Sequence, residues 1–357
     1  MTDQSTDQAH DPQPMAIPRF GISVNGLHLP WPTPWSELFG RSAPLALEIG
    51  FGGGHFLVDL AIQHPDWNII GVERSFYSVV ETEKRIEKAS VKNARLVYSD
   101  ARLVLTYVCA PDTMDRIYVN FPDPFPKKAH AKRRLLTPDT LALIVSRLTV
   151  GGQLTIATDV LAYAESVAES LAQTIGLQNQ HSTPWVNAIP NRRPTRYERK
   201  ALDRGEPCYY FEYTRTAVDV PQPPPLSAVS HPGEYPPMPN AILSSPLTLD
   251  QFAEKFTPKT HFDPPYRIHF LTLYFNQDHT ALLIDTFVDE PLIEQRMGIM
   301  ITRQAPDRYA DHYVVRLDAL GYPRPTPGAH VAVALIVDWL AKLHPETKIL
   351  HHAIQES

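Results

Sequence analysis

The chain has 357 residues, of which 43% are hydrophobic, and a formal net charge of −6. That hydrophobic content is enough for a packed core and excludes a wholly disordered chain, while the length allows one large domain or two ordinary ones. The negative charge excludes a surface that is basic throughout, although a local basic patch could still bind nucleic acid.

The termini, apolar runs and cysteines bear on where the protein works. No apolar run approaches the roughly 20 residues that a membrane helix needs. The first residues, MTDQSTDQAHDPQP, lack the basic and apolar regions of a secretory signal. Cys109 and Cys208 match no metal-ligand spacing and are typical of reduced thiols. We therefore expect a cytoplasmic protein with no membrane partner and no metal; the oligomeric state cannot be read from the sequence.

Short apolar runs alternate with helical patterns after a tail, residues 1–18, that we expect to be disordered. Nearly continuous apolar runs are typical of parallel strands that are covered on both faces. Their alternation with amphipathic segments predicts a parallel, doubly wound α/β sheet in a domain of residues 19–217. The expected strands are residues 45–50, 68–73, 94–100, 115–121, 152–159 and 209–214, with helices at 76–89 and 138–148.

The composition changes after this domain. Proline is frequent in residues 218–247, which indicates a semi-rigid linker. Alternating patterns at residues 267–275, 280–288, 295–304 and 311–320 then predict an antiparallel sheet, followed by a helix at 328–343. We expect a small α+β domain over residues 248–357, with an interaction role favoured over RNA binding. Because every candidate site residue precedes the linker, we also expect a chain cut at about residue 217 to fold and act alone.

A glycine-rich turn follows the first strong strand, in the run LEIGFGGGHFLVDLA. Glycines let the backbone approach a ligand closely, and the next helix offers unpaired N–H groups. A dinucleotide fingerprint needs G-x-G-x-x-G; Gly50 and Gly52 fit, but His55 occupies the third position. Glu48 would repel a pyrophosphate, whereas it suits a ligand that carries an ammonium and a sulfonium. The turn thus favours S-adenosylmethionine over NAD, and a purely structural tight turn is the third reading.

Acidic residues also end the next two strands. Glu73 can bind both hydroxyls of a ribose, a role common to both ligand classes. Asp100 is placed to face the amino group of an adenine, or to cap the helix that follows, and both roles can hold together.

The run NFPDPFPKKAHAKRR, residues 120–134, is the most informative segment. Its prolines stiffen a loop that holds Asp123 at the carboxyl end of the fourth strand, the edge where open α/β sheets bind ligands. The basic residues that follow are a solvated face or, beside a cofactor pocket, a site for a polyanion. A second basic cluster precedes the last strand and comprises Arg192, Arg193, Arg196, Arg199, Lys200 and Arg204.

The segments LEIGFGGG, IIGVE, FPDPFPKKAHAKRR, GGQLTIATD and TRYERKALDRGEPCYYFEYTR together resemble the bacterial tRNA (guanine-N7-)-methyltransferases over about residues 35–215. The resemblance implies a Rossmann-like class I S-adenosylmethionine methyltransferase sheet. It implies that the methyl donor contacts Glu48, Gly50, Gly52, Glu73, Asp100 and Asp123. It assigns the guanine nucleotide to Lys127, Asp159, Thr195, Arg196, Tyr197 and Glu198. It assigns contacts with tRNA to Lys128, His130, Lys132, Arg133 and Arg134.

Two departures from the family pattern stand out. Phe125 occupies a position where tryptophan is common, and the chain continues for about 140 residues where the family is expected to end. The alternatives are a methyltransferase acting on another RNA, on a protein or on a small molecule, an NAD-dependent oxidoreductase, and a catalytically inactive RNA-binding protein.

The chemistry follows from guanine itself. N7 carries a free lone pair at neutral pH, so its methylation needs no general base and depends mainly on alignment. Asp123 is the expected catalytic residue. It could stabilise the cationic product ring, a role open also to Asp159 or Glu198, or hold the N1 and N2 donors of guanine.

Overall fold

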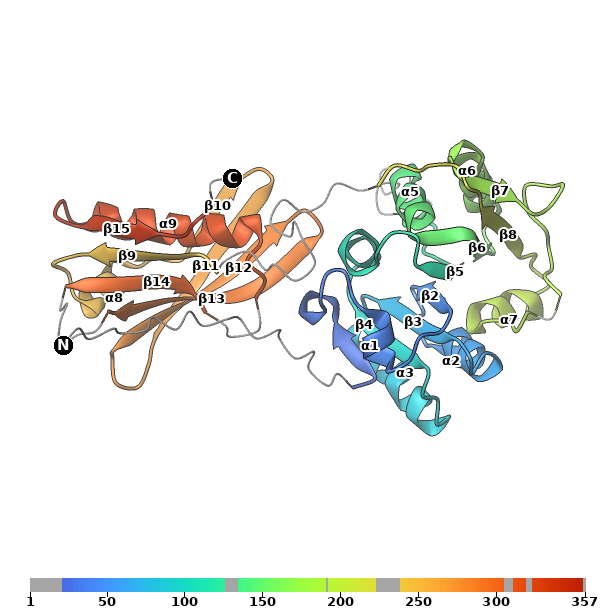
Figure 1. Cartoon of the computed structure of the whole chain (residues 1–357), viewed down its shortest axis with the longest axis horizontal. Helices are drawn as coiled ribbons and strands as arrows, with labels where there is room; N and C mark the ends of the chain where they lie inside the picture. The colour runs from blue at the N-terminus through green and yellow to red at the C-terminus, as the bar shows by residue number, and fades with distance from the viewer. Residues whose placement is uncertain are drawn as a thin grey trace, which may run out of the picture.

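The computed structural model describes residues 21–125, 134–190, 192–222, 238–304, 311–318 and 323–355. Its elements form two sheets, each with its own helices, which lie side by side (Figure 1). The tail expected at residues 1–18 lies outside the described residues.

The N-terminal sheet has the strand order β1-β4-β3-β2-β5-β6-β8-β7 within the described residues. All neighbouring pairs from β1 to β6 are parallel, and β8 is antiparallel to both β6 and β7. The predicted doubly wound sheet is thus confirmed. The strands are β1 (Ser23–Asn25), β2 (Leu45–Ile49), β3 (Asn68–Glu73), β4 (Ala94–Tyr98), β5 (Met114–Asn120), β6 (Leu148–Thr158), β7 (Leu177–Asn179) and β8 (Tyr209–Arg215).

Helices cover both faces of this sheet (Figure 1). One face packs against η2, α5 and α6, and the other packs against α2 and α3. The helices are η1 (Gly26–His28), α1 (Trp35–Phe39), α2 (His55–Gln63), α3 (Phe76–Lys88), α4 (Ala101–Leu103), η2 (Val104–Val108), α5 (Pro138–Arg147), α6 (Leu161–Gln173) and α7 (Arg196–Asp203).

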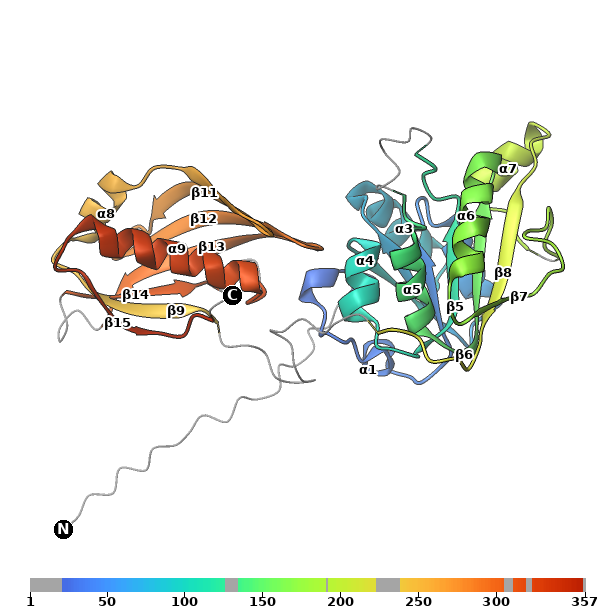
Figure 2. The ribbon, with the colours of Figure 1, turned by 90° about the horizontal axis from the view of Figure 1, so that it is seen from above.

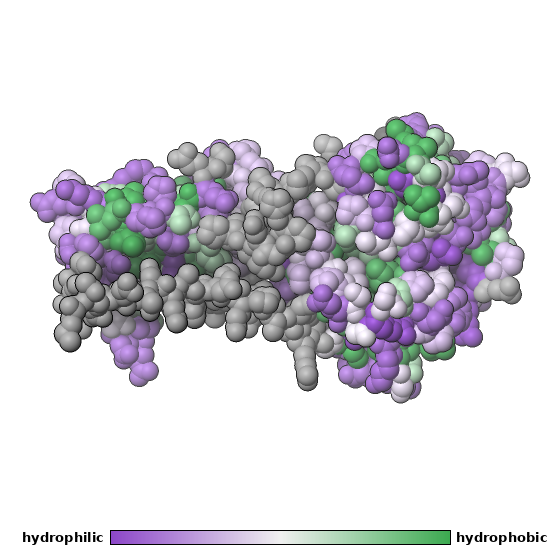
Figure 3. Space-filling model, viewed as in Figure 1, coloured by the Kyte–Doolittle hydropathy of each residue, from purple (hydrophilic) through white to green (hydrophobic). Residues whose placement is uncertain are grey.

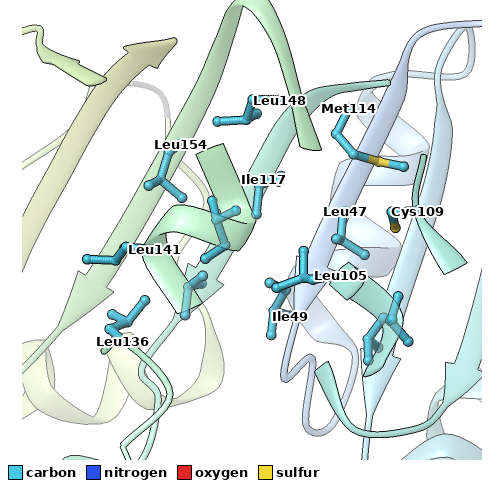
Figure 4. Packing of buried hydrophobic residues seen from close by; sticks show 14 of the residues in the cluster. Leu47, Ile49, Leu105, Cys109, Met114, Ile117, Leu136, Leu141, Leu148 and Leu154 are labelled. Carbon is cyan, nitrogen blue, oxygen red and sulfur yellow. The ribbon is translucent and has the colours of Figure 1, made fainter. Parts of the chain in front are cut away.

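Burial on both faces explains why the central strands read as continuous apolar runs. Figure 4 shows Leu47 and Ile49 of β2 beside Leu105 of η2, with Ile117 of β5 and Leu141 of α5 in the same layer; all are buried. Local signals set the helix starts, as in α5, where the Thr137 side chain accepts the Thr140 N–H and Pro138 takes the first turn.

The C-terminal sheet is antiparallel throughout, in the order β10-β11-β12-β13-β14-β9-β15. Its two helices complete the predicted α+β domain, and α9 lies along one face of the sheet (Figure 2). The elements are β9 (Asn240–Ser244), α8 (Leu249–Lys255), β10 (Lys259–Asp263), β11 (Tyr266–Phe275), β12 (Ala281–Glu290), β13 (Ile293–Arg303), β14 (His312–Leu317), α9 (Pro327–Leu343) and β15 (Lys348–His352).

Two of the differences from the predicted boundaries concern the linker and strand β6. Strand β9 lies inside the range expected as linker, because its short NAILS pattern follows prolines yet pairs with both β14 and β15. Strand β6 begins at Leu148 rather than at residue 152, since the strand continues directly from α5 through a glycine pair. None of the described helices has both the length and the apolar character required to cross a membrane.

Candidate methyl-donor and guanine site

The glycine turn after β2 lies where the strand order reverses between β2 and β5. At such a point the chain leaves in opposite directions on the two sides, and a crevice opens at the carboxyl ends of the strands. Gly50 and Gly52 have φ values of +72° and +51°, which side chains other than glycine rarely adopt. A pocket of about 480 Å³ opens beside this turn.

Glu48 lies at the floor of the pocket and is only 2% exposed. Its Oε1 accepts a hydrogen bond of 2.9 Å from Nδ2 of Asn120, whereas its Oε2 has no partner among the described residues. Burial raises the pKa of Glu48 from 4.5 to about 7, against the lowering effects of the Asn120 hydrogen bond and the Arg192 charge. A buried carboxylate oxygen without a partner fits a ligand cation such as an ammonium.

Glu73 and Asp100 lie along the same wall, after β3 and β4. Glu73 accepts backbone N–H groups of Gly52, at 3.0 Å, and of Arg74 and Ser75, at 2.8 and 2.9 Å, so its carboxylate is fixed toward the glycine turn. Asp100 caps α4 by accepting the Arg102 N–H at 2.8 Å. The capping role of Asp100 is therefore confirmed. Its second carboxylate oxygen lies 3.4 Å from the Arg74 guanidinium, and both residues line the pocket.

The loop after β5 holds Asp123 at the opposite wall, with its side chain exposed. Phe121 and Phe125, two residues to either side, have φ values of +52° and +37°. Such strained backbone is common at functional sites, where the surrounding structure enforces it.

The side chain of Arg134 supports the loop that carries Asp123. Its guanidinium donates to the carbonyl oxygens of Pro124 at 2.9 Å and Phe125 at 3.3 Å, and it lies 5.5 Å from the centre of the Tyr163 ring. The side chain predicted to contact RNA thus also fixes the backbone next to Asp123. The expected sites Lys127, Lys128, His130, Lys132 and Arg133 lie outside the described residues.

The segment expected to bind guanine forms the first turn of α7. Thr195 and Glu198 make a capping box, in which each side chain accepts the other residue's backbone N–H at 3.0 Å. Glu198 is 3% exposed and also accepts the Tyr210 hydroxyl at 2.7 Å, so its carboxylate is occupied within the protein. Thr195, Arg196 and Tyr197 line the pocket, and the Tyr197 side chain is 62% exposed.

Two of the described site predictions, Glu198 and Asp159, do not line the pocket. Asp159 follows β6 and is partly buried near Cys208 and Arg204. Conversely, Asn120 and Phe56 line the pocket, although the sequence pattern predicts no role for either residue. The only sequence signal for Asn120 was its place at the end of a strand beside the Asp123 loop.

The C-terminal domain reaches the neighbourhood of this pocket. The turn between β12 and β13 lines a second cavity, of about 520 Å³, which shares Arg74, Ser99, Asp100 and Arg102 with the first pocket. Ile293 of β13 is buried in the core of the N-terminal domain. Arg324 lies 3.8 Å above the centre of the Trp31 ring and donates to the carbonyl oxygens of Leu27, at 2.7 Å, and Leu29. The two domains are therefore packed together here.

The strand order, with an antiparallel strand β8 next to β6, and the glycine turn that follows Glu48 of β2 define the Rossmann-like class I methyltransferases. The comparisons with known proteins narrow this class.

Residues 42–211 match the family described as "Putative methyltransferase". The tRNA (guanine-N(7)-)-methyltransferase of Thermus thermophilus is 31% identical over 312 residues, which cover 87% of this chain and 93% of that protein. The enzyme of the same name from Saccharophagus degradans is 38% identical over 201 residues, 56% of this chain and 86% of that protein. The chain belongs to the bacterial tRNA (guanine-N(7)-)-methyltransferase family.

The Thermus match corrects one expectation. An alignment of 312 residues is longer than the 217 residues expected before the linker, so it extends into the C-terminal domain. The chain therefore does not continue past the end of every family member; at least one relative shares part of this extension.

Proposed function

We propose that the chain transfers a methyl group from S-adenosylmethionine to N7 of a guanine in the variable loop of tRNA, in the cytoplasm. The observation that carries this proposal is Oε2 of Glu48, which has no hydrogen-bond partner among the described residues and is buried beneath a pocket whose rim includes Asp123 and Tyr197. The names of the relatives support the nucleic acid and the atom that is methylated.

The wall from Glu48 to Asp100 has the chemistry of a methyl-donor site. The carboxylate of Glu48 binds the ammonium, and Glu73 accepts the ribose hydroxyls while Gly52 holds its carboxylate in place. Asp100 meets the adenine edge. S-adenosylmethionine supplies a sulfonium-bound, electrophilic methyl group, and the remaining task of the protein is to orient the guanine toward it.

The opposite wall has the chemistry of a guanine site. Asp123 is exposed at the pocket mouth and accepts the N1 and N2 donors of guanine or stabilises the positive charge that forms on the methylated ring. Tyr197 offers an exposed ring on which a base can stack. Glu198 contributes by capping α7, since its carboxylate is already hydrogen-bonded within the protein.

No residue in this arrangement needs to remove a proton. N7 attacks with its lone pair, so the rate depends on holding nucleophile, methyl carbon and sulfur in line, which contributes up to roughly 7–11 kcal/mol. The strained, Arg134-braced backbone around Asp123 suits that positioning task.

The direct test is to incubate the purified chain with an unmodified tRNA transcript and labelled S-adenosylmethionine, and then to identify the labelled nucleoside. Label in N7-methylguanosine from the variable loop is the expected result. Label in another nucleoside, or in another RNA only, would replace the proposed substrate. Normal binding of S-adenosylhomocysteine without any transfer would instead indicate an inactive RNA-binding protein.

A further inference from the structure

Arg192 is a buried cation that the proposed reaction does not use. Its side chain is 6% exposed and lies between two aromatic rings, 5.0 Å from the centre of Phe56 and 5.3 Å from that of Tyr210. A charge removed from water in this way is costly unless several partners compensate it. Its partners therefore indicate what the residue is for.

Those partners belong to the two halves of the pocket. On one side, Arg192 Nη2 donates to Oδ1 of Asn120 at 2.5 Å, and Asn120 in turn donates to Glu48. On the other side, Arg192 Nε donates to Oε2 of Glu198 at 3.3 Å. A single side chain thus joins the floor of the methyl-donor wall to the cap of α7.

The amide of Asn120 has one orientation that satisfies both neighbours. Its NH₂ group faces the carboxylate of Glu48 and its oxygen faces the cation of Arg192. The planar fork of arginine can serve Asn120 and Glu198 at once, whereas a lysine ammonium is a point charge that cannot reproduce this geometry.

We propose that Arg192 is a positioning residue that couples occupation of the methyl-donor site to binding of tRNA at the first turn of α7. The inference rests on the proposed function, because it takes Glu48 as the ammonium site and residues 195–197 as the guanine rim.

The coupling has a simple physical basis. A ligand ammonium on Glu48 keeps this carboxylate charged, which strengthens its hydrogen bond from Asn120. Hydrogen bonds in a chain polarise one another in a low-dielectric interior, so the bond from Arg192 to Asn120 strengthens too. Arg192 is then held in the position that supports Glu198 and the capping box with Thr195. By linkage, tRNA must favour methyl-donor binding by the same factor.

The experiment measures the Kd of tRNA by filter binding with and without saturating S-adenosylhomocysteine, whose ammonium is the same but which cannot react. For the wild type we expect S-adenosylhomocysteine to tighten tRNA binding about fivefold or more. The measured quantity is the Kd of tRNA without S-adenosylhomocysteine divided by the Kd with it. This ratio should fall to about 1 in Arg192→Gln, and in Arg192→Lys it should be less than half of the wild-type ratio.

Arg193→Gln is the matched control. Arg193 is the next residue, and its side chain is 59% exposed, 3.8 Å from Asp59. Its loss removes the same charge from the basic cluster, so tRNA can bind more weakly, but the ratio should stay at the wild-type value. The control therefore separates coupling from simple loss of positive charge.

Each result has one reading. A wild-type ratio near 1, or a wild-type ratio preserved in Arg192→Gln, overturns the inference. If Arg192→Gln gives no cooperative melt, Arg192→Lys decides in its place, and a full ratio there overturns the inference. A wild type that binds S-adenosylhomocysteine but methylates no tRNA contradicts the proposed function instead, whatever the variants do.

Discussion

The two sheets of this protein use charged side chains in opposite ways. At the carboxyl edge of the parallel sheet, Glu48 is buried and one of its oxygens has no partner in the described part of the chain, while Asp123 is exposed at a pocket mouth. On the antiparallel sheet, arginines are paired with carboxylates of the same domain. These pairs are Arg267 with Asp289, Arg296 with Asp285, and Arg316 with Asp318.

The difference follows from topology. Parallel strands bring all their carboxyl ends to one edge, so acids from β2, β3 and β4 meet there, whereas antiparallel strands alternate their ends between two edges. The first sheet therefore concentrates acidic side chains where a ligand can reach them. The second domain contacts the first where Arg324 lies over the Trp31 ring. The face seen in Figure 3 is mainly hydrophilic over both domains, with small hydrophobic areas.

Among changes at the edge of the parallel sheet, Asp123→Ala should have the largest effect on activity. We expect kcat/KM for tRNA methylation to fall at least about 100-fold, because loss of the carboxylate misplaces the guanine. The melting temperature should not change, since the side chain is exposed. Glu87→Ala, which removes an exposed acid from α3, is the control. Activity of Asp123→Ala within a few fold of the wild type would remove this residue from the site.

A smaller effect should follow from the raised pKa of Glu48. With a pKa of about 7 in the free protein, the carboxyl is largely neutral at pH 5.5 and about half ionised at pH 7. The affinity for S-adenosylhomocysteine, measured by calorimetry, should therefore rise roughly tenfold from pH 5.5 to pH 7. Glu48→Gln should bind weakly and with no such dependence on pH.

The same pKa predicts the sign of a stability change. The folded protein holds a proton on Glu48 above pH 4.5 that the unfolded chain has lost, so this group lowers the free energy of unfolding as pH rises from about 4.5 to 7. Glu48→Gln should lack that part of the decline. A ligand-free wild type and variant with parallel stability profiles would contradict the raised pKa that burial gives this carboxyl.

Patterning predicted most of the fold because its signals are local. The strands from β2 to β5 lie within two residues of the expected ranges, since burial on both faces leaves continuous apolar runs. The pattern missed β9 and β15, because these short strands are defined by pairing with distant segments. It also missed β10, whose mostly exposed residues lack an apolar alternation although the strand forms a hairpin with β11. Pattern alone cannot supply such partners.

The sequence predicts those site residues whose role can be inferred from their own position in a local motif. Glu48 and the glycine turn follow from the first βα unit alone. The bridge from Asn120 through Arg192 to Glu198 joins residues up to 78 positions apart and appears only once β5 and α7 are placed. Likewise, the charge of Arg134 suggested phosphate binding, while its carbonyl partners could not be read from the sequence.

A further prediction compares the basic loop with the antiparallel sheet, whose arginines are paired with carboxylates. Replacing Lys128, Lys132 and Arg133 together by Ala should weaken tRNA binding. The slope of the logarithm of the tRNA binding constant against the logarithm of the salt concentration should become less steep by about 2, because fewer counterions are released. Arg134 is kept because it braces the Asp123 loop. The matched control is Arg267→Ala on the antiparallel sheet, which should leave the salt slope unchanged. An unaltered slope in the triple variant would show that these basic residues are exposed to solvent and do not contact tRNA.

The smallest effect on activity should come from the second sheet itself. A chain cut after residue 217 should fold and methylate tRNA within about threefold of the full chain. Its melting temperature should fall by about 5 °C or more, because the burial of Ile293 and the contact of Arg324 with Trp31 are lost. Arg324→Ala in the full chain should give part of this decrease. Normal binding of S-adenosylhomocysteine without tRNA methylation would instead make the second domain part of the substrate site.

The central claim is that the pocket methylates N7 of one guanine, and one substituted substrate tests it directly. In 7-deazaguanine a C–H group replaces N7, so the lone pair that should attack the methyl group is absent. A tRNA with this single replacement at the variable-loop guanine should bind the purified chain as the unmodified tRNA does, and should accept no methyl group. Methylation of the substituted tRNA at the rate of the unmodified one would contradict N7 of that guanine as the target.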